Sequence, residues 1–231
     1  MPDIFDASAE KSNRGGTTSD PEEVRSHKLV RDVNEYSMVM RDEQPSNNPF
    51  KSFVAKPEKI FFDSQHYEEK VLLLLRRHPV TQLGWILISI AMIFAPILFF
   101  SVGVLDFLPP NYQLAALIGW YLILTGFVLE SFLTWFYNVY IITDERVIDV
   151  DFYNLLFKNI SSAKLDNIED VTSVTGGLMA SIFNYGTVKI QTAGAVTEFD
   201  FEDVPQPAKV TAFLNEMMLE EEREKLENRA T

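Results

Sequence analysis

No cysteine occurs among the 231 residues, which excludes disulfide bonds, thiol catalysis, cysteine-ligated zinc and iron–sulfur clusters. The three histidines, His27, His66 and His78, lie far apart and lack the spacing of metal ligands. All three precede the long apolar runs, so the C-terminal part has no histidine that could activate a serine. We therefore predict no metal site, no cofactor and no catalytic residues, and a protein that is not an enzyme.

The N-terminus lacks an apolar core: residues 1–12 carry Asp3, Asp6 and Glu10, which is not the pattern of a cleavable signal peptide. Positive charge is scarce too, with 20 Lys and Arg against 33 Asp and Glu and a net charge of −13. Residues 143–231 alone hold 17 acidic and 8 basic side chains. Such an acidic segment is repelled by nucleic acid and by anionic headgroups, so we predict no nucleic-acid binding.

Long apolar runs are concentrated between residues 80 and 142. Residues 82–105 carry no charge, and residues 113–137 carry only Glu130. Each run is long enough as a helix to cross a hydrocarbon layer of about 30 Å. A buried hairpin in a soluble protein would need a larger surrounding core than this chain offers. We predict a transmembrane helical hairpin over 81–137, in which the paired prolines Pro109 and Pro110 stop the first helix.

Lysine and arginine placement predicts the orientation of this hairpin. Lys70, Arg76 and Arg77 precede the first span, whereas the turn at 106–112 carries no basic residue. Because positive flanks stay on the cytoplasmic side, we expect a multi-pass protein of the inner membrane with both termini cytoplasmic. Lys70, Arg76, Arg77 and His78 are candidate contacts to lipid headgroups, with generic anchoring favoured over specific lipid binding.

Small residues recur along one face of each span and predict close approach of helices, within the chain or between copies. The candidate helix–helix or oligomer contacts are Gly84, Ala91, Ala95, Gly119, Gly126 and Glu130. Glu130 is a functional candidate because carboxylates inside membranes are rare. Its alternative role is structural, as a protonated or water-reached group. No second ionisable group accompanies it in the spans, so a proton or ion relay has little support.

The segments before the hairpin are polar or amphipathic. Residues 1–58 are rich in Ser, Asn, Asp and Glu and predict a disordered N-terminal tail, with a transient helix over 24–40. Residues 59–80 predict a juxtamembrane amphipathic segment: an extended piece, then a helix capped by Ser64 whose leucines 72–75 face all sides.

After residue 137 the apolar pattern alternates, which indicates antiparallel strands with one buried face. We predict strands at 139–143, 146–152, 157–164, 168–175, 187–192 and 197–202, the first two joined by a hairpin at Asp144–Glu145. A helix beginning at Pro205 or Pro207 then carries one apolar stripe, formed by Val210, Phe213, Leu214 and Met217. The domain is placed at 138–218, followed by a charged helical tail at 219–231.

Several of these segments resemble one family. Tyr140, Thr143 and Arg146 fit its Y-x-x-T-x-x-R opening, residues 165–171 resemble its next element, and residues 184–190 resemble its G/N-Y-G-T-V-x-I strand. Residues 201–207 resemble the start of its last helix, and residues 76–79 its basic junction before the first span. The chain is similar to the bacterial pleckstrin-homology-like (bPH) family, in the membrane-anchored form with two transmembrane helices.

This resemblance implies an α+β membrane protein: a transmembrane hairpin followed by a PH-like, bent, seven-stranded antiparallel sheet or barrel capped by a C-terminal helix. It implies binding or scaffolding rather than catalysis. Phosphoinositide binding is not expected, because Lys158, Lys164 and Lys189 are isolated in an acidic domain. We predict a membrane-tethered interaction module that contacts the bilayer and binds its own copies or other membrane proteins. The alternative is a small transporter or channel subunit that uses Glu130.

Overall fold

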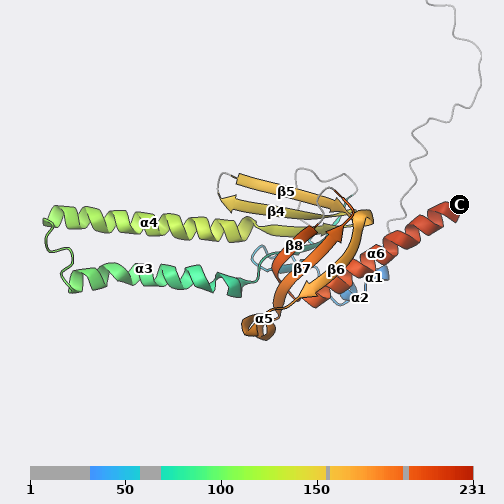
Figure 1. Ribbon diagram of the computed structural model, residues 1–231, viewed down its shortest axis with the longest axis horizontal. Helices are drawn as coiled ribbons and strands as arrows, with labels where there is room; N and C mark the ends of the chain where they lie inside the picture. The colour runs from blue at the N-terminus through green and yellow to red at the C-terminus, as the bar shows by residue number, and fades with distance from the viewer. Residues whose placement is uncertain (1–31, 58–68, 155–156, 195–197, 231) are drawn as a thin grey trace, which may run out of the picture. The chain divides into compact units, whose positions relative to one another are not determined.

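The computed structural model describes residues 32–57, 69–154, 157–194 and 198–230. Within these ranges the chain forms two antiparallel sheets, the long apolar helices α3 (Leu83–Ser101) and α4 (Pro110–Tyr137), and the C-terminal helix α6 (Pro207–Ala230) (Figure 1). The predicted α+β class is confirmed, with sheets that are not closed into a barrel. The predictions for residues 1–31 lie outside the described residues.

Helices α3 and α4 run side by side as a hairpin (Figure 1). A short 3-10 helix, η1 (Pro79–Gln82), leads into α3. Between the helices, the indole N–H of Trp120 donates to the carbonyl of Met92 at 2.9 Å, and the ring of Trp120 meets that of Phe99 edge-on. Both helices are long and apolar enough to cross a membrane, as the sequence predicts for residues 81–137.

The turn between these helices differs from the prediction. Helix α3 ends at Ser101, and Gly103, two residues later, adopts a φ of +70°. The N–H of Gly103 donates to the carbonyl of Phe100, and that of Val104 to the carbonyl of Phe99. This is the Schellman arrangement, in which a left-handed glycine closes the last turn. The paired prolines therefore begin α4, with Pro110 in its first turn, and do not stop α3.

The first sheet has five strands in the order β1 (Phe53–Ala55), β2 (Val71–Leu75), β3 (Val139–Thr143), β4 (Arg146–Asn154) and β5 (Phe157–Lys164). Neighbours β2 and β3 pair antiparallel, with Leu75 opposite Tyr140, although the whole hairpin lies between them in the chain. The hairpin is thus an insertion between two adjacent strands of one sheet. The resemblance implies a hairpin that precedes the whole sheet, and this expectation is wrong because β1 and β2 come before the hairpin.

The helix predicted over the leucines at 72–75 is wrong, because these residues form the buried strand β2. Leu73 and Leu75 enter the main core, whereas Val71 and Leu74 join a second cluster with Ile141 and Ile148. Burial of both faces removes the alternation that identifies a half-exposed strand, and a continuous apolar run is left. The proposed cap Ser64 lies outside the described residues.

The second sheet has the order β6 (Ile168–Val174), β7 (Tyr185–Thr192) and β8 (Glu198–Pro205). A 3-10 turn, η2 (Leu165–Asn167), precedes β6, and the short helix α5 (Leu178–Phe183) joins β6 to β7. All six predicted strands are confirmed to within a few residues, and α6 begins at Pro207 as expected. Its stripe is buried, since Val210, Phe213 and Leu214 are fully inaccessible to solvent.

Residues 32–57 are not a disordered tail. They form two single-turn helices, α1 (Val33–Tyr36) and α2 (Met38–Arg41), and the edge strand β1. Met40 is fully buried in the main core, and the hydroxyl of Ser37 donates to Glu216 of α6. The ammonium group of Lys56 donates hydrogen bonds to the carbonyls of Met40 and Glu43. The few apolar residues of this polar segment suffice because they join a core that the strands of both sheets and α6 supply.

Candidate functional site

The junction between the domain and the helical hairpin is built around Arg76, the residue that follows β2. Its side chain is buried, and its Nε donates to the carbonyl of Phe136 at 3.0 Å, near the end of α4. Nη1 donates to the carbonyl of Pro49 at 2.6 Å, and the guanidinium lies 4.8 Å from the ring centre of Phe136. Burial lowers the pKa of Arg76 from its ordinary value. One side chain therefore joins the segment before β1, the end of β2 and the end of α4.

The next two residues continue this junction. The carbonyl of Arg77 accepts the indole N–H of Trp135 at 3.0 Å, which again joins the start of α3 to the end of α4. The backbone N–H of His78 donates to the carbonyl of Asp203 in β8 at 2.7 Å. The imidazole stacks on Tyr185 with ring centres 5.4 Å apart, and burial lowers its pKa. The basic run before the first span is thus fixed to both sheets.

The four candidate headgroup contacts do not lie together. Lys70 is exposed at the opposite end of β2, where its backbone N–H donates to Asp144. Arg76 is buried, with its donors directed at backbone carbonyls. Arg77 and His78 are partly exposed just before η1, so headgroup contact stays a prediction for these two residues.

A polar cluster lies next to this junction, formed by Arg77, Tyr140, Asp149 and Glu202. Arg77 pairs with Glu202 of β8, and the backbone N–H of Glu202 donates to the hydroxyl of Tyr140 at 3.1 Å. Tyr140 is buried, stacks on Phe201 at 4.5 Å, and has its pKa raised to about 12 by burial. Asp149 stands opposite Tyr140 in the pairing of β3 with β4.

Asp149 is the unusual member of this cluster. Burial is the main cause that raises its pKa to about 7, and the negative charge of Asp151 adds to the effect while Arg77 opposes it. Its Oδ1 and the Nε of Arg77 are buried, and neither makes a hydrogen bond with the described residues. A carboxyl group that holds a proton near neutral pH therefore lies at the base of the helical hairpin.

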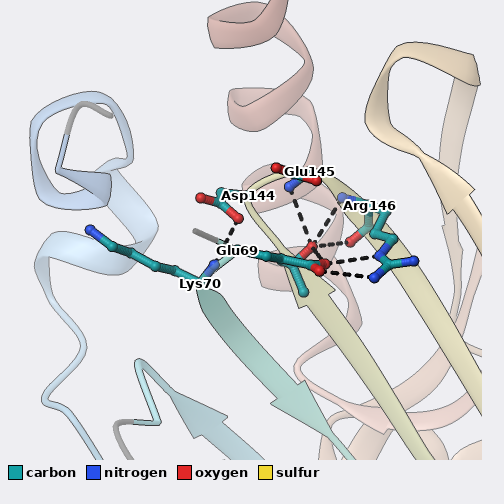
Figure 2. A network of polar contacts seen from close by, with 6 residues as sticks. Glu69, Lys70, Asp144, Glu145 and Arg146 are labelled. Atoms are coloured by element: carbon teal, nitrogen blue, oxygen red, sulfur yellow. Dashed lines mark hydrogen bonds and ion pairs between the residues drawn. The ribbon is translucent and has the colours of Figure 1, made fainter. Parts of the chain in front are cut away.

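The Y-x-x-T-x-x-R pattern proves to be an anchoring device at the other end of β3. Figure 2 shows Glu69 facing the guanidinium of Arg146. The Nε and Nη2 of Arg146 donate to Oε1 and Oε2 of Glu69 at 2.9 Å each. The hydroxyl of Thr143 lies 2.7 Å from Glu69 Oε1 and accepts the backbone N–H of Arg146. The Glu69 side chain is fully buried. Together with the Tyr140 contact, these bonds tie the β3–β4 hairpin to β2 and β8.

The predicted contact residues of the two apolar helices differ in exposure. Ser89, Pro96 and Leu124 are the buried residues of these helices, whereas Glu130 is exposed. A Cβ added at Gly84, Gly119 or Gly126 would meet no atom within 4 Å. Ala91 is exposed and Ala95 half-buried. Contact of the six residues with another helix therefore stays a prediction, with Gly84, Ala91, Gly126 and Glu130 open to another molecule.

A groove of about 460 Å³ lies between α6 and the start of β6. Its apolar floor includes Leu165, Ile168 and Met218, and its rim carries Asp166, Glu221, Glu222 and Lys225. Lys225 forms an ion pair with Asp166 across this rim. A rim with more carboxylates than ammonium groups is unsuited to a phosphate ligand.

Sequence reasoning missed Glu69, Asp149 and the buried state of Arg76. The role of Glu69 is missed because the sequence predicts a helix in this segment, where the structure has β2. Asp149 left a signal, since it interrupts the apolar residues Val147, Ile148 and Val150 within one strand. Its neighbours Arg77 and Glu202 come from distant elements, so the cluster forms only where the β3–β4 pair meets β8 of the other sheet and the residue Arg77 after β2.

Comparison with known proteins gives one family. Residues 79–218, which are more than half of the chain, match the family described as the bacterial PH domain. The match begins at the first residue of η1 and ends in α6, so it leaves out β1 and β2 although both belong to the sheet. No curated protein and no solved structure gives a significant match.

Asp149→Asn should change the pH dependence of stability. Between the ordinary carboxyl pKa of 3.8 and about 7, the folded state binds a proton that the unfolded state releases, so stability falls as pH rises through this window. At pH 8 the variant should be more stable than the parent by about 1–3 kcal/mol, after allowance for partial solvent screening, and at pH 4 the two should agree. Thermal unfolding in detergent at both pH values, with exposed Asp170→Asn as control, measures this. Equal gains at both pH values would contradict it.

Glu69→Ala should destabilise the fold by about 2–4 kcal/mol, because it leaves the guanidinium of Arg146 without its buried partner. The matched control is Glu198→Ala, which removes an exposed partner of Lys189 and should change stability by less than about 1 kcal/mol. Denaturant unfolding of the purified variants gives both numbers. A similar loss of unfolding free energy in the two variants would show that burial of the Glu69–Arg146 pair adds nothing to its contribution to stability.

Proposed function

The chain belongs to the bacterial PH domain family, and from this premise we propose that it is a PH-like interaction module tethered to a membrane by its helical hairpin. The exposure of the hairpin carries the proposal. Leu87, Ile97 and Leu122 each keep more than 60% of their surface accessible. Apolar surface in water is unfavourable by about 25 cal/mol per Å², so two helices that expose it all round need lipid as their solvent.

The attachment of the hairpin supports a rigid tether. Helix α3 leaves from β2 and α4 returns to β3, and these strands are hydrogen-bonded neighbours. The Arg76 and Trp135 contacts close the base of the hairpin. Both flanks of the hairpin therefore lie on the same side of the bilayer. Lysine and arginine on these flanks, and none in the turn, support the proposal that this side is the cytoplasmic one.

Binding rather than catalysis is the proposed activity of the module. The polar clusters around Tyr140 and Thr143 hold strands together, and the groove beside α6 has an acidic rim. Partners with basic or apolar surfaces suit this domain better than nucleic acid or phosphoinositides. We infer that its partners are other membrane proteins or further copies of the chain.

Self-association is proposed through the outward faces of the spans. Gly119 and Gly126 lie on α4 with open space above them, and Gly84 lies similarly on α3. Close backbone approach at such positions is a common basis of helix association in lipid. Glu130 on the same side of α4 would donate or accept a hydrogen bond across such a contact. The transport alternative depends on Glu130 alone, which is the single charged residue of α3 and α4.

Accessibility labelling tests the tether, and the absence of native cysteine makes single-cysteine variants clean. With a membrane-impermeant maleimide on intact spheroplasts, Phe107→Cys in the turn should react, and Leu226→Cys in α6 should react only after permeabilisation. Both positions are exposed, so reactivity reports sidedness and not burial. If both variants react only after permeabilisation, the hairpin does not cross the membrane.

Gly126→Leu should weaken self-association in mild detergent, because the larger side chain fills the space needed for close approach. Thr125→Leu is the matched control: it is also exposed, but consecutive helical residues are rotated by about 100°, so it lies on a different side of α4. Light scattering during gel filtration should show a smaller species for the first variant alone. A parent protein that is monomeric under these conditions would overturn the assembly proposal.

A further inference from the structure

Helix α5 presents an apolar surface that the domain does not use. Of its six residues Ala180 is buried, whereas Leu178 and Ile182 are 76% and 63% exposed. Met179 and Phe183 are exposed as well. Gly177 precedes the helix with a φ of +91°, and Asn184 ends it in the left-handed conformation. Large apolar side chains are therefore exposed on a short projection between β6 and β7.

This projection adjoins the start of the first apolar helix. The imidazole of His78 stacks on Tyr185 and lies with its ring centre 6.4 Å from that of Phe183, the last residue of α5. Pro79, the next residue, begins the apolar stretch that runs to Ser101. Figure 1 shows α5 beside this start of the hairpin, at the end of β6 and β7. The apolar surface of α5 is thus continuous with the point where the chain would leave the cytoplasm.

The segment around α5 is uncharged, in contrast to the acidic rest of the domain. Residues 171–188 contain no Asp, Glu, Lys or Arg, although residues 143–231 hold 17 acidic and 8 basic side chains. Acidic surfaces are repelled by anionic headgroups, whereas an uncharged tip with leucine, isoleucine, methionine and phenylalanine can enter the boundary between headgroups and acyl chains. An exposed apolar patch of this kind commonly marks a binding surface.

We propose that α5 inserts Leu178, Met179, Ile182 and Phe183 into the cytoplasmic interface of the bilayer, as a third attachment point beside the two spans. The ligand is the acyl boundary of the lipid, with no requirement for a particular headgroup. This inference depends on the proposed function, because it needs the hairpin to be in the membrane. Its effect is to hold one end of the second sheet against the bilayer.

The test uses the full chain in vesicles of phosphatidylcholine and phosphatidylglycerol, with an environment-sensitive fluorophore on single cysteines. Leu178→Cys and Ile182→Cys report on α5, Leu122→Cys on a span, and Leu226→Cys on an exposed position in α6. All four side chains are exposed, so the substitutions leave the core intact. Quenching is measured with nitroxide-labelled lipids and with aqueous iodide.

The expected result is loss of fluorescence with nitroxide lipids and none with iodide at positions 178, 182 and 122, and the opposite at position 226. Quenching by lipid at 122 but by iodide at 178 and 182 would overturn the α5 proposal and leave the tether intact. Protection of 178 and 182 from both quenchers would also overturn it, since protein would then cover the helix. Quenching of position 122 by iodide would instead overturn the membrane tether itself.

Discussion

The buried guanidinium of Arg76 is the interaction on which the arrangement of the hairpin and the domain depends. It reaches the carbonyl of Pro49 before β1 and that of Phe136 near the end of α4, while its own backbone continues β2. A planar group with several donors in fixed directions can serve acceptors on separate segments at once, which an ammonium group on a flexible stem does less well. Trp135 and His78 extend the same junction to α4 and β8. The hairpin is thereby attached to the domain through both of its ends.

The family pattern acquires a structural meaning from these contacts. Tyr140, Thr143 and Arg146 lie on or beside one strand and bond two neighbours: Tyr140 bonds β8, whereas Thr143 and Arg146 both bond Glu69, just before β2. Their spacing of three residues places them at the two ends of β3 and its turn. A pattern of this kind specifies how strands are joined and not what the domain binds. The binding specificity of the module must therefore come from surfaces outside the pattern.

The sequence predicts those parts of the fold in which one face is buried and the other is wet. Strands β7 and β8 alternate because water covers one side, and the stripe of α6 has helical spacing for the same reason. Strand β2 was misread because both of its faces are covered, so its leucines carry no period. Met40 is a core residue within a polar segment. The average composition of such a segment predicts disorder and does not reveal that one of its residues is buried. The cluster around Asp149 depends on register between elements far apart in the chain, which no local pattern contains.

The position of the hairpin between β2 and β3 has a consequence for how the protein is made. A ribosome releases β2 first, then residues 76–138, and only afterwards the strand with which β2 must pair. Until β3 emerges, one edge of β2 has no hydrogen-bonded neighbour. Unpaired strand edges of this kind favour aggregation. Closure of the first sheet is consequently a late event in biosynthesis, because β2 can pair with β3 only after both apolar helices have been synthesised.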